Sequence, residues 1–136
     1  LIYEGDGSEA EELKNRASKN VLFLGRIDFE HVIALLKSSD IYCLPSVSEG
    51  MSTSVLEAIA TKTFVITTYN GGAREVIIGD EYGIITRGNT VQEIKTAIEK
   101  AMDLDYRASA TKKAYKRLED GFTWEKTAEK LESLAK

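Results

Sequence analysis

The sequence predicts an α/β protein with a doubly wound, Rossmann-like parallel sheet, and three observations support this prediction. Short apolar segments alternate along the chain with longer segments of helical periodicity. The apolar segments, such as 41–44 and 64–67, are continuous runs, which is typical of parallel strands buried on both faces. Loops rich in Gly, Ser and Thr follow several of these runs. In such folds ligands bind outside the carboxyl ends of the strands, so these loops are the expected site.

The expected strands and helices alternate. Strands are expected at 1–3, 21–24, 41–44, 64–67 and 83–86. Helices are expected from the Ser8 region to about 19, at 28–40, 55–60, 73–78, around 91–101, at 106–118 and from 123 onward. The stripe of Ile94, Ala97, Ile98 and Ala101 has the spacing of a surface helix.

Helix starts are marked by capping residues. Ser8 with Glu11, and Thr90 with Glu93, have the spacing of a capping box. Asp28 and Thr123 precede apolar periodic segments and are expected to cap the helices that follow.

Length and composition predict one domain over 1–136, with its C-terminal helix at 121–136. The net charge of −4 argues against binding to nucleic acid or to a membrane surface. No apolar run approaches the roughly 20 residues of a membrane span. The single cysteine, Cys43, falls in an expected buried strand and is interpreted as a core residue of a protein from a reducing compartment. Because the chain opens on strand-like residues without a Met, we expect a fragment truncated at its N-terminus.

The central feature is the strand-to-helix turn at 49–57, where Glu49 and Glu57 bracket a small polar loop. The free N–H groups at a helix start, together with the positive end of its dipole, make an anion site. Glu57 falls about one turn into the helix, where its carboxylate can accept hydrogen bonds from a sugar diol. The loops 25–29, 45–54 and 68–75 all follow expected strands and should converge.

With its motifs taken in order, the chain resembles the C-terminal domain of a retaining glycosyltransferase of GT-B fold, in the family called glycosyltransferase group 1. That family has two glutamates separated by seven residues, as Glu49 and Glu57 are here. The other resembling segments are Gly5-Asp6-Gly7-Ser8-Glu9, Val21–Ile27, Pro45–Gly50, Leu56-Glu57-Ala58, Gly71–Glu75 and Phe122-Thr123-Trp124-Glu125. The resemblance covers essentially the whole chain.

The resemblance implies roles for individual residues. Glu57 would hold the ribose of a nucleotide-sugar donor, and Glu49, the expected catalytic residue, would lie near the hydroxyls of the donor sugar. The base would contact Arg26 and Ile27. The sugar and diphosphate would be held by the loop and helix start, which comprise Gly50, Met51, Ser52, Thr53, Ser54 and Val55.

The resemblance also implies a reaction and partners. A hexosyl-type transferase would move a sugar from a nucleoside diphosphate to an acceptor with retention of anomeric configuration. No cofactor and no metal are expected, because helix dipoles and basic side chains neutralise the phosphates. The acceptor domain would be an absent N-terminal domain, without which the fragment should bind donor weakly and not turn over. A cytoplasmic setting in polysaccharide, lipopolysaccharide or capsule, or glycolipid synthesis is expected, with any membrane association made through the missing domain.

Three departures from the family pattern have physical consequences. The family usually has Gly-Thr-Pro after the motif helix, where this chain has Lys62-Thr63-Phe64. A left-handed cap at Lys62 would cost ~1 kcal/mol that glycine avoids. Ser54 replaces a common proline and keeps an N–H group. The family's Gly-Arg and Lys that serve the diphosphate have no counterpart here, since Gly25-Arg26 follows a different strand.

Several interpretations stay open at this point. Ser52, Thr53 and Ser54 fit capping as well as phosphate binding. Arg26 fits a surface ion pair as well as a donor contact, and Arg74 fits an ion pair better. His31 is read as an ordinary helix residue, and Tyr42, Phe64 and Trp124 are read as packing residues. A nucleotide-sugar epimerase of GT-B fold and a non-catalytic flavodoxin-like binding module are the alternative functions.

Overall fold

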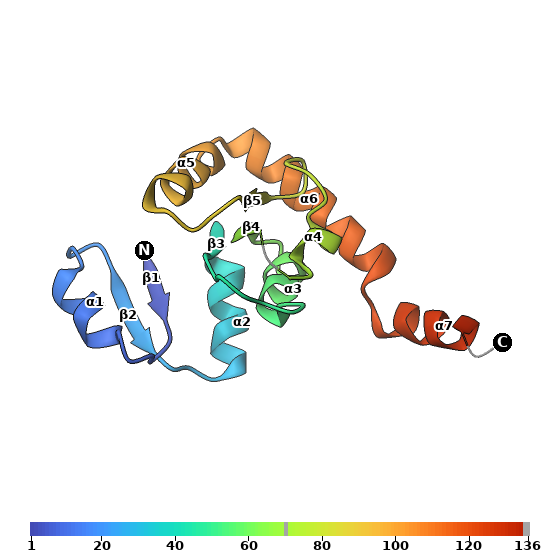
Figure 1. Ribbon diagram of the computed structural model, residues 1–136, viewed down its shortest axis with the longest axis horizontal. Helices are drawn as coiled ribbons and strands as arrows, with labels where there is room; N and C mark the ends of the chain where they lie inside the picture. Colours follow the sequence, from blue (N-terminus) through green and yellow to red (C-terminus); the bar gives the residue numbers. More distant parts are fainter. Residues whose placement is uncertain (70, 135–136) are drawn as a thin grey trace. The chain divides into compact units, whose positions relative to one another are not determined.

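A computed structural model describes residues 1–69 and 71–134. The chain divides into two compact units, Leu1–Leu35 and Leu36–Lys136, with the boundary inside helix α2. The strands are β1 (Ile2–Glu4), β2 (Leu22–Gly25), β3 (Ile41–Leu44), β4 (Phe64–Thr68) and β5 (Ile84–Thr86); the helices are α1 (Ala10–Arg16), α2 (Phe29–Ser38), α3 (Thr53–Ala60), α4 (Ala73–Val76), α5 (Val91–Ala101), α6 (Leu104–Gly121) and α7 (Trp124–Leu134) (Figure 1). Every expected strand and helix is present, which confirms the α/β prediction. The single nucleotide-sugar-binding domain over 1–136 stays a prediction.

The N-terminal unit contains a two-stranded parallel sheet. β1 pairs with β2, and α1 is the crossover between them. The rings of Tyr3 and Phe23, which are register partners, lie 5.2 Å apart. The capping box predicted for α1 is wrong, because the helix starts later than Ser8 requires. Glu9 is at the cap position without a side-chain hydrogen bond, and Glu11 instead pairs with Lys14 at 2.9 Å.

The start of α2 is capped as predicted. The carboxylate of Asp28 accepts a hydrogen bond from the backbone N–H of His31 at 3.0 Å. The same carboxylate oxygen lies 2.7 Å from Nδ1 of His31. These contacts, the backbone hydrogen bond first, lower the pKa of Asp28. Both side chains are exposed, which agrees with an ordinary surface role for His31.

The C-terminal unit is built on the parallel sheet β3-β4-β5, in that order. All five residues of β4, the middle strand, are buried. The register pairs Leu44 with Thr67 and Thr68 with Thr86, so the three strands end at the same edge. The loops that follow β3 and β4 therefore start beside each other.

Helices cover both faces of this sheet. One face presents Phe64, Ile66 and Ile84, which pack with alanines of α5 and α6, the gold-to-orange arch in Figure 1. Cys43 packs against the same core, and its burial raises the pKa of the thiol, in keeping with a structural residue. On the opposite face Tyr42 reaches α3. Within this unit the doubly wound arrangement is confirmed.

The later helix caps were predicted with mixed success. The Thr90–Glu93 capping box at the start of α5 is present in both directions. Thr123 accepts a hydrogen bond from the N–H of Lys126, as expected. α6 is longer than the predicted 106–118, because Asp103 caps it through the N–H of Tyr106 at 3.0 Å. Trp124, read as a packing residue, is 86% exposed, so that interpretation is wrong.

Helix α3 ends with Lys62 in the left-handed conformation, the case for which a cost of ~1 kcal/mol was expected. Its φ is 62°, and no other non-glycine among the described residues has a positive φ. The N–H of Thr63 bonds the carbonyl of Ala58 at 2.8 Å, and the N–H of Lys62 bonds that of Ile59 at 3.0 Å. This pair of bonds is the Schellman motif, which normally places glycine at this position.

Candidate functional site

The candidate site is the turn between β3 and α3, at the carboxyl edge of the three-stranded sheet. The strand ends at Leu44 and the helix begins at Thr53, so Glu49 lies in the connecting loop. Glu49 is half-buried, while Gly50 and Met51 are exposed. The strand-loop-helix arrangement predicted for residues 49–57 is therefore present.

The first N–H groups of α3 are open. The first hydrogen bond of the helix runs from the N–H of Leu56 to the carbonyl of Ser52, at 3.4 Å. Within the described part of the chain no acceptor is bonded to the N–H groups of Thr53, Ser54 or Val55. Such groups at a helix start attract an anion. The capping interpretation of Ser52 is wrong, since its side chain makes no cap hydrogen bond.

The serine hydroxyls are engaged with each other and with the sheet. Oγ of Ser52 lies 2.9 Å from Oγ of Ser54. The hydroxyl of Tyr42 donates to Oγ of Ser54 at 2.8 Å. Tyr42 was expected only to pack, so sequence reasoning missed this polar contact. A tyrosine in an otherwise apolar strand, next to a serine-rich turn, is the signal that was available.

Among the described residues, the side chains of the two glutamates have no hydrogen-bond or ion-pair partner. In residues 1–69 and 71–134, neither Glu49 nor Glu57 makes a side-chain hydrogen bond or an ion pair. Val55 and Ile59 are buried and form the inner face of α3, whereas Thr53 is exposed and Glu57 is half-buried. Residues four apart share a helix face, so Glu57 follows Thr53 by one turn on the open side. The role of Glu57 as a diol-binding carboxylate stays a prediction.

The loop after β4 packs against the Glu49 loop. The N–H of Gly72 donates to the carbonyl of Gly50 at 2.8 Å. Gly71 has a φ of 52°, and a Cβ there would lie 2.0 Å from the carbonyl oxygen of Glu49. The predicted convergence of loops 45–54 and 68–75 is confirmed, and it depends on a glycine at Gly71.

Arg74 has a different partner from the one expected. Its guanidinium stacks over the ring of Tyr69 at 4.4 Å and also donates to the Tyr69 hydroxyl. The interpretation of Arg74 as half of an ion pair is therefore wrong: among the described residues its partner is an exposed aromatic ring. Planar guanidinium groups stack on rings in this way.

The predicted base-contacting residues belong to the N-terminal unit. Arg26 is exposed and Ile27 half-buried, directly after Gly25, whose φ is 67°. The approach of the 25–29 loop to the other two loops stays a prediction, as do the donor contacts of Arg26 and Ile27.

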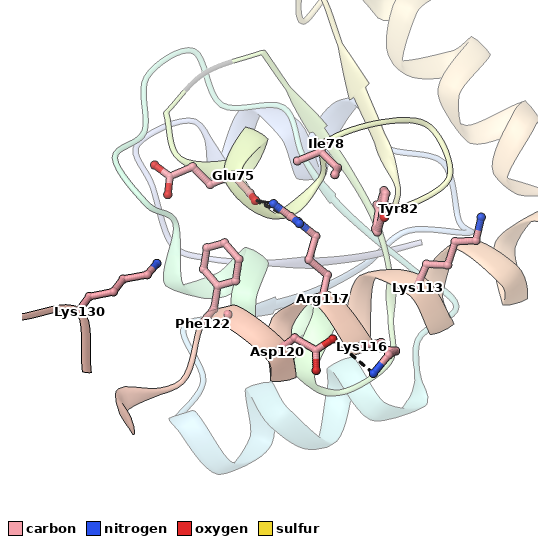
Figure 2. A pocket seen from close by; sticks show the side chains of 10 residues that line it. Glu75, Ile78, Tyr82, Lys113, Lys116, Arg117, Asp120, Phe122 and Lys130 are labelled. Atoms are coloured by element: carbon pink, nitrogen blue, oxygen red, sulfur yellow. Dashed lines mark hydrogen bonds and ion pairs between the residues drawn. The ribbon is translucent and has the colours of Figure 1, made fainter. Parts of the chain in front are cut away.

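Two cavities of the C-terminal unit lie away from the Glu49–Glu57 turn. One, of about 720 Å³, is lined by the end of α6, by Lys130 of α7 and by the segment 75–82. Figure 2 shows the guanidinium of Arg117 directed at the backbone carbonyl of Glu75, to which it donates at 2.8 and 3.2 Å. The other cavity, of about 790 Å³, lies around Lys62, Arg107 and Tyr115. The Arg117 contact ties α6 to the segment that carries the Gly71 loop.

The described residues contain neither a metal-ligand cluster nor a membrane-spanning helix. In 1–69 and 71–134, no three His, Cys, Asp or Glu side chains gather as metal ligands would. Over the same residues, none of the helices has both the length and the apolarity of a membrane crossing. The metal-free phosphate site and the cytoplasmic setting stay predictions.

Comparison with known sequences gives relatives over nearly the whole chain. An uncharacterized glycosyltransferase of Methanocaldococcus jannaschii is 31% identical over 98% of this chain and 36% of its own length. A glycogen synthase of Mycobacterium tuberculosis is 28% identical over 94% of this chain and 32% of its own. The chain thus spans about a third of these relatives.

Solved structures share the fold. Sucrose-phosphate synthase from Thermosynechococcus elongatus superposes with a TM-score of 0.83 at 23% identity, over 99% of this chain and 37% of that one. HepE of Anabaena, in complex with UDP and glucose, gives 0.81 at 22% identity, over 97% and 40%. The sequence profile of the family "Glycosyl transferases group 1" matches residues 1–117. This chain belongs to the group 1 glycosyl transferases and has the fold of the C-terminal part of a GT-B glycosyltransferase.

Proposed function

We propose that this chain is the donor-binding part of a retaining glycosyltransferase that uses a nucleoside-diphosphate sugar. The observation that carries the proposal is the start of α3, where three successive N–H groups lack an acceptor among the described residues and Glu57 follows one turn after Thr53. A diphosphate fits the N–H groups, and a ribose diol fits the carboxylate.

The comparisons support the same ligand class. The Anabaena relative of similar fold is known in complexes with UDP and with UDP-glucose. A nucleotide sugar has a diphosphate with a ribose diol on one side and sugar hydroxyls on the other. This arrangement fits an anion site at the start of α3 with Glu57 and Glu49 near it. Glu49 would accept hydrogen bonds from the donor sugar, and Arg26 and Ile27 would contact the base.

The whole protein would complete the active site. We propose that the full-length protein adds an N-terminal acceptor domain and the Gly-Arg and Lys that serve the diphosphate in the family, so the fragment alone would bind donor weakly. The sugar would pass to an acceptor in polysaccharide or glycolipid synthesis on the cytoplasmic side, without a metal. Glycogen synthase and a phosphatidylinositol monomannoside mannosyltransferase of Corynebacterium glutamicum, both relatives, act on such acceptors.

The test is nucleotide binding by the full-length protein. Calorimetry with UDP, GDP and ADP should identify one nucleoside diphosphate that binds. Glu57→Ala should weaken that binding by roughly 10- to 100-fold, because hydrogen bonds to a charged group contribute about 1.5–3 kcal/mol. Glu132→Ala, in the exposed helix α7, is the matched control and should bind as the wild type does. Unchanged binding and transfer in Glu57→Ala would refute the assigned site.

A further inference from the structure

Three hydroxyl groups connect the sheet to the first turn of α3. Tyr42, in β3, donates to Oγ of Ser54 at 2.8 Å, and Oγ of Ser54 lies 2.9 Å from Oγ of Ser52. Ser54 is within the first turn of the helix, and Ser52 is its cap residue. The phenol of Tyr42 thereby fixes the orientation of the two serine side chains at the helix start.

One of the three hydroxyl protons has no acceptor among the described residues. Each hydroxyl has one proton to donate and two lone pairs to accept with. The proton of Tyr42 goes to Ser54, and the two serines share a single hydrogen bond. Whichever serine donates in that bond, the other keeps a proton for which the described residues offer no acceptor.

This leftover proton lies in a place where it needs an acceptor. When Ser54 donates to Ser52, the leftover proton is that of Ser52, which is only 9% exposed, and buried donors in proteins are normally hydrogen-bonded. When Ser52 donates instead, the leftover proton is that of Ser54, in the first turn of the helix. The cap residue could have satisfied an N–H group of its own helix, but its hydroxyl is turned to Ser54 instead. The leftover serine proton and the N–H groups of Thr53 to Val55 are therefore neighbours, and within residues 1–69 and 71–134 none of them has an acceptor.

We infer that Tyr42 is a positioning residue for the diphosphate: through Ser54 it holds a serine proton toward the anion that the start of α3 receives. This inference rests on the proposed function, and it adds a side-chain donor to the backbone donors. Tyr42 itself touches no substrate. Its loss should weaken recognition of phosphate and leave recognition of the nucleoside alone.

The experiment measures binding to the full-length protein by calorimetry, with the nucleoside diphosphate that binds the wild type and with the corresponding nucleoside. The variants are Tyr42→Phe, Ser52→Ala and the double variant, with Tyr115→Phe on α6 as the control. Tyr42→Phe should weaken diphosphate binding by roughly 3- to 10-fold, the worth of one hydrogen bond. The double variant should bind no more weakly than Ser52→Ala, since Tyr42 acts through the serines. Nucleoside binding and Tyr115→Phe should match the wild type.

Three results would overturn the inference. They are unchanged diphosphate affinity in Tyr42→Phe, full additivity of the Tyr42 and Ser52 effects, and an equal loss of nucleoside affinity. If Tyr42→Phe fails to fold, Ser54→Ala cuts the same link and keeps the aromatic ring, and it should give the same selective loss. A wild-type protein that binds no nucleoside diphosphate would refute the proposed function itself, whereas a binding wild type with an unaffected Tyr42→Phe refutes only the positioning role.

Discussion

Gly71 shows how one residue can fix the geometry of two loops. Its left-handed φ of 52° and the 2.0 Å approach of a hypothetical Cβ to the carbonyl oxygen of Glu49 leave no room for a side chain. The three atoms nearest to that Cβ are backbone atoms of Glu49 and Gly50, so relief requires the Glu49–Gly50 segment to move. The conformation of the candidate site therefore depends on this glycine.

Gly71→Ala should destabilise the protein by about 2 kcal/mol or more, because a left-handed alanine costs roughly 1–2 kcal/mol before the clash is counted. It should also weaken donor binding, because the Glu49 loop shifts. Thermal melting and calorimetry of the full-length protein measure the two effects. Gly121→Ala, where a Cβ meets nothing within 4 Å, is the control and should not lower the melting temperature. Equal melting of the two variants would contradict the argument.

Lys62 is the opposite case, a left-handed residue that is not glycine. Lys62→Gly should stabilise the protein by up to ~1 kcal/mol, because glycine adopts this cap without strain. Part of that gain is lost with the contact between the Lys62 ammonium and the Tyr115 ring, 4.7 Å apart. Lys62→Ala keeps the strain and loses the contact, so it should melt below the wild type. A lower melting temperature for Lys62→Gly than for Lys62→Ala would show that the cap is not strained.

At the scale of the elements, the start of α5 links helix capping to pH. Hydrogen bonds from the hydroxyl and N–H of Thr90 to the carboxylate of Glu93 lower the pKa of Glu93 below its ordinary value of 4.5. A carboxyl whose pKa is lowered in the folded state stabilises that state above its unfolded pKa. The contribution is lost as the pH falls through the folded value.

Thr90→Ala should therefore return the pKa of Glu93 toward its ordinary value. The stability of the variant should then fall less steeply than that of the wild type as the pH drops below about 4.5. Carbon-detected NMR titration of the Glu93 carboxyl measures the pKa directly. Thr96→Ala, in the middle of the same helix, removes a hydroxyl that does not touch Glu93 and should leave its titration unchanged. A Glu93 pKa that is the same in wild type and Thr90→Ala would contradict the capping explanation.

How far the sequence predicted the elements depended on where their stabilising contacts lie. Apolar runs such as 64–67 predicted strands well, because burial on both faces leaves a signal in the strand itself. The cap at Ser8 failed, since a Ser-x-x-Glu spacing also occurs where the helix begins later. α6 was predicted too short because its N-cap, Asp103, was not recognised as a cap.

The candidate site was predicted in the same uneven way. The sequence predicted the helix start between Glu49 and Glu57, because both glutamates and the loop lie in one short segment. The hydroxyl contact from Tyr42 was not, since twelve residues separate it from Ser54 and only the β3–α3 packing brings them together. The stacking of Arg74 on Tyr69 was missed because an exposed arginine gives no sign of its partner.

At the scale of the whole molecule, the fold places the start of α3 at the carboxyl edge of the three-stranded sheet, where a ligand can reach it. A protein that binds a ligand only in its folded state gains stability from it: about 2.7 kcal/mol at a ligand concentration one hundred times the dissociation constant. The gain should be largest locally, where open N–H groups acquire an acceptor. Amides that exchange through local opening report such a change individually.

Hydrogen exchange of the full-length protein provides this measurement. Addition of the nucleoside diphosphate that binds should slow exchange at the amides of Thr53, Ser54 and Val55, which lack acceptors in the described structure. The nucleoside without phosphates should leave these three amides unchanged, because it brings no anion to the helix start. The amide of Phe64, which is bonded to the carbonyl of Asp40 at 3.2 Å, is the internal reference and should exchange slowly throughout. If the diphosphate binds and the three amides exchange as before, the anion lies elsewhere, and the start of α3 is not the donor site.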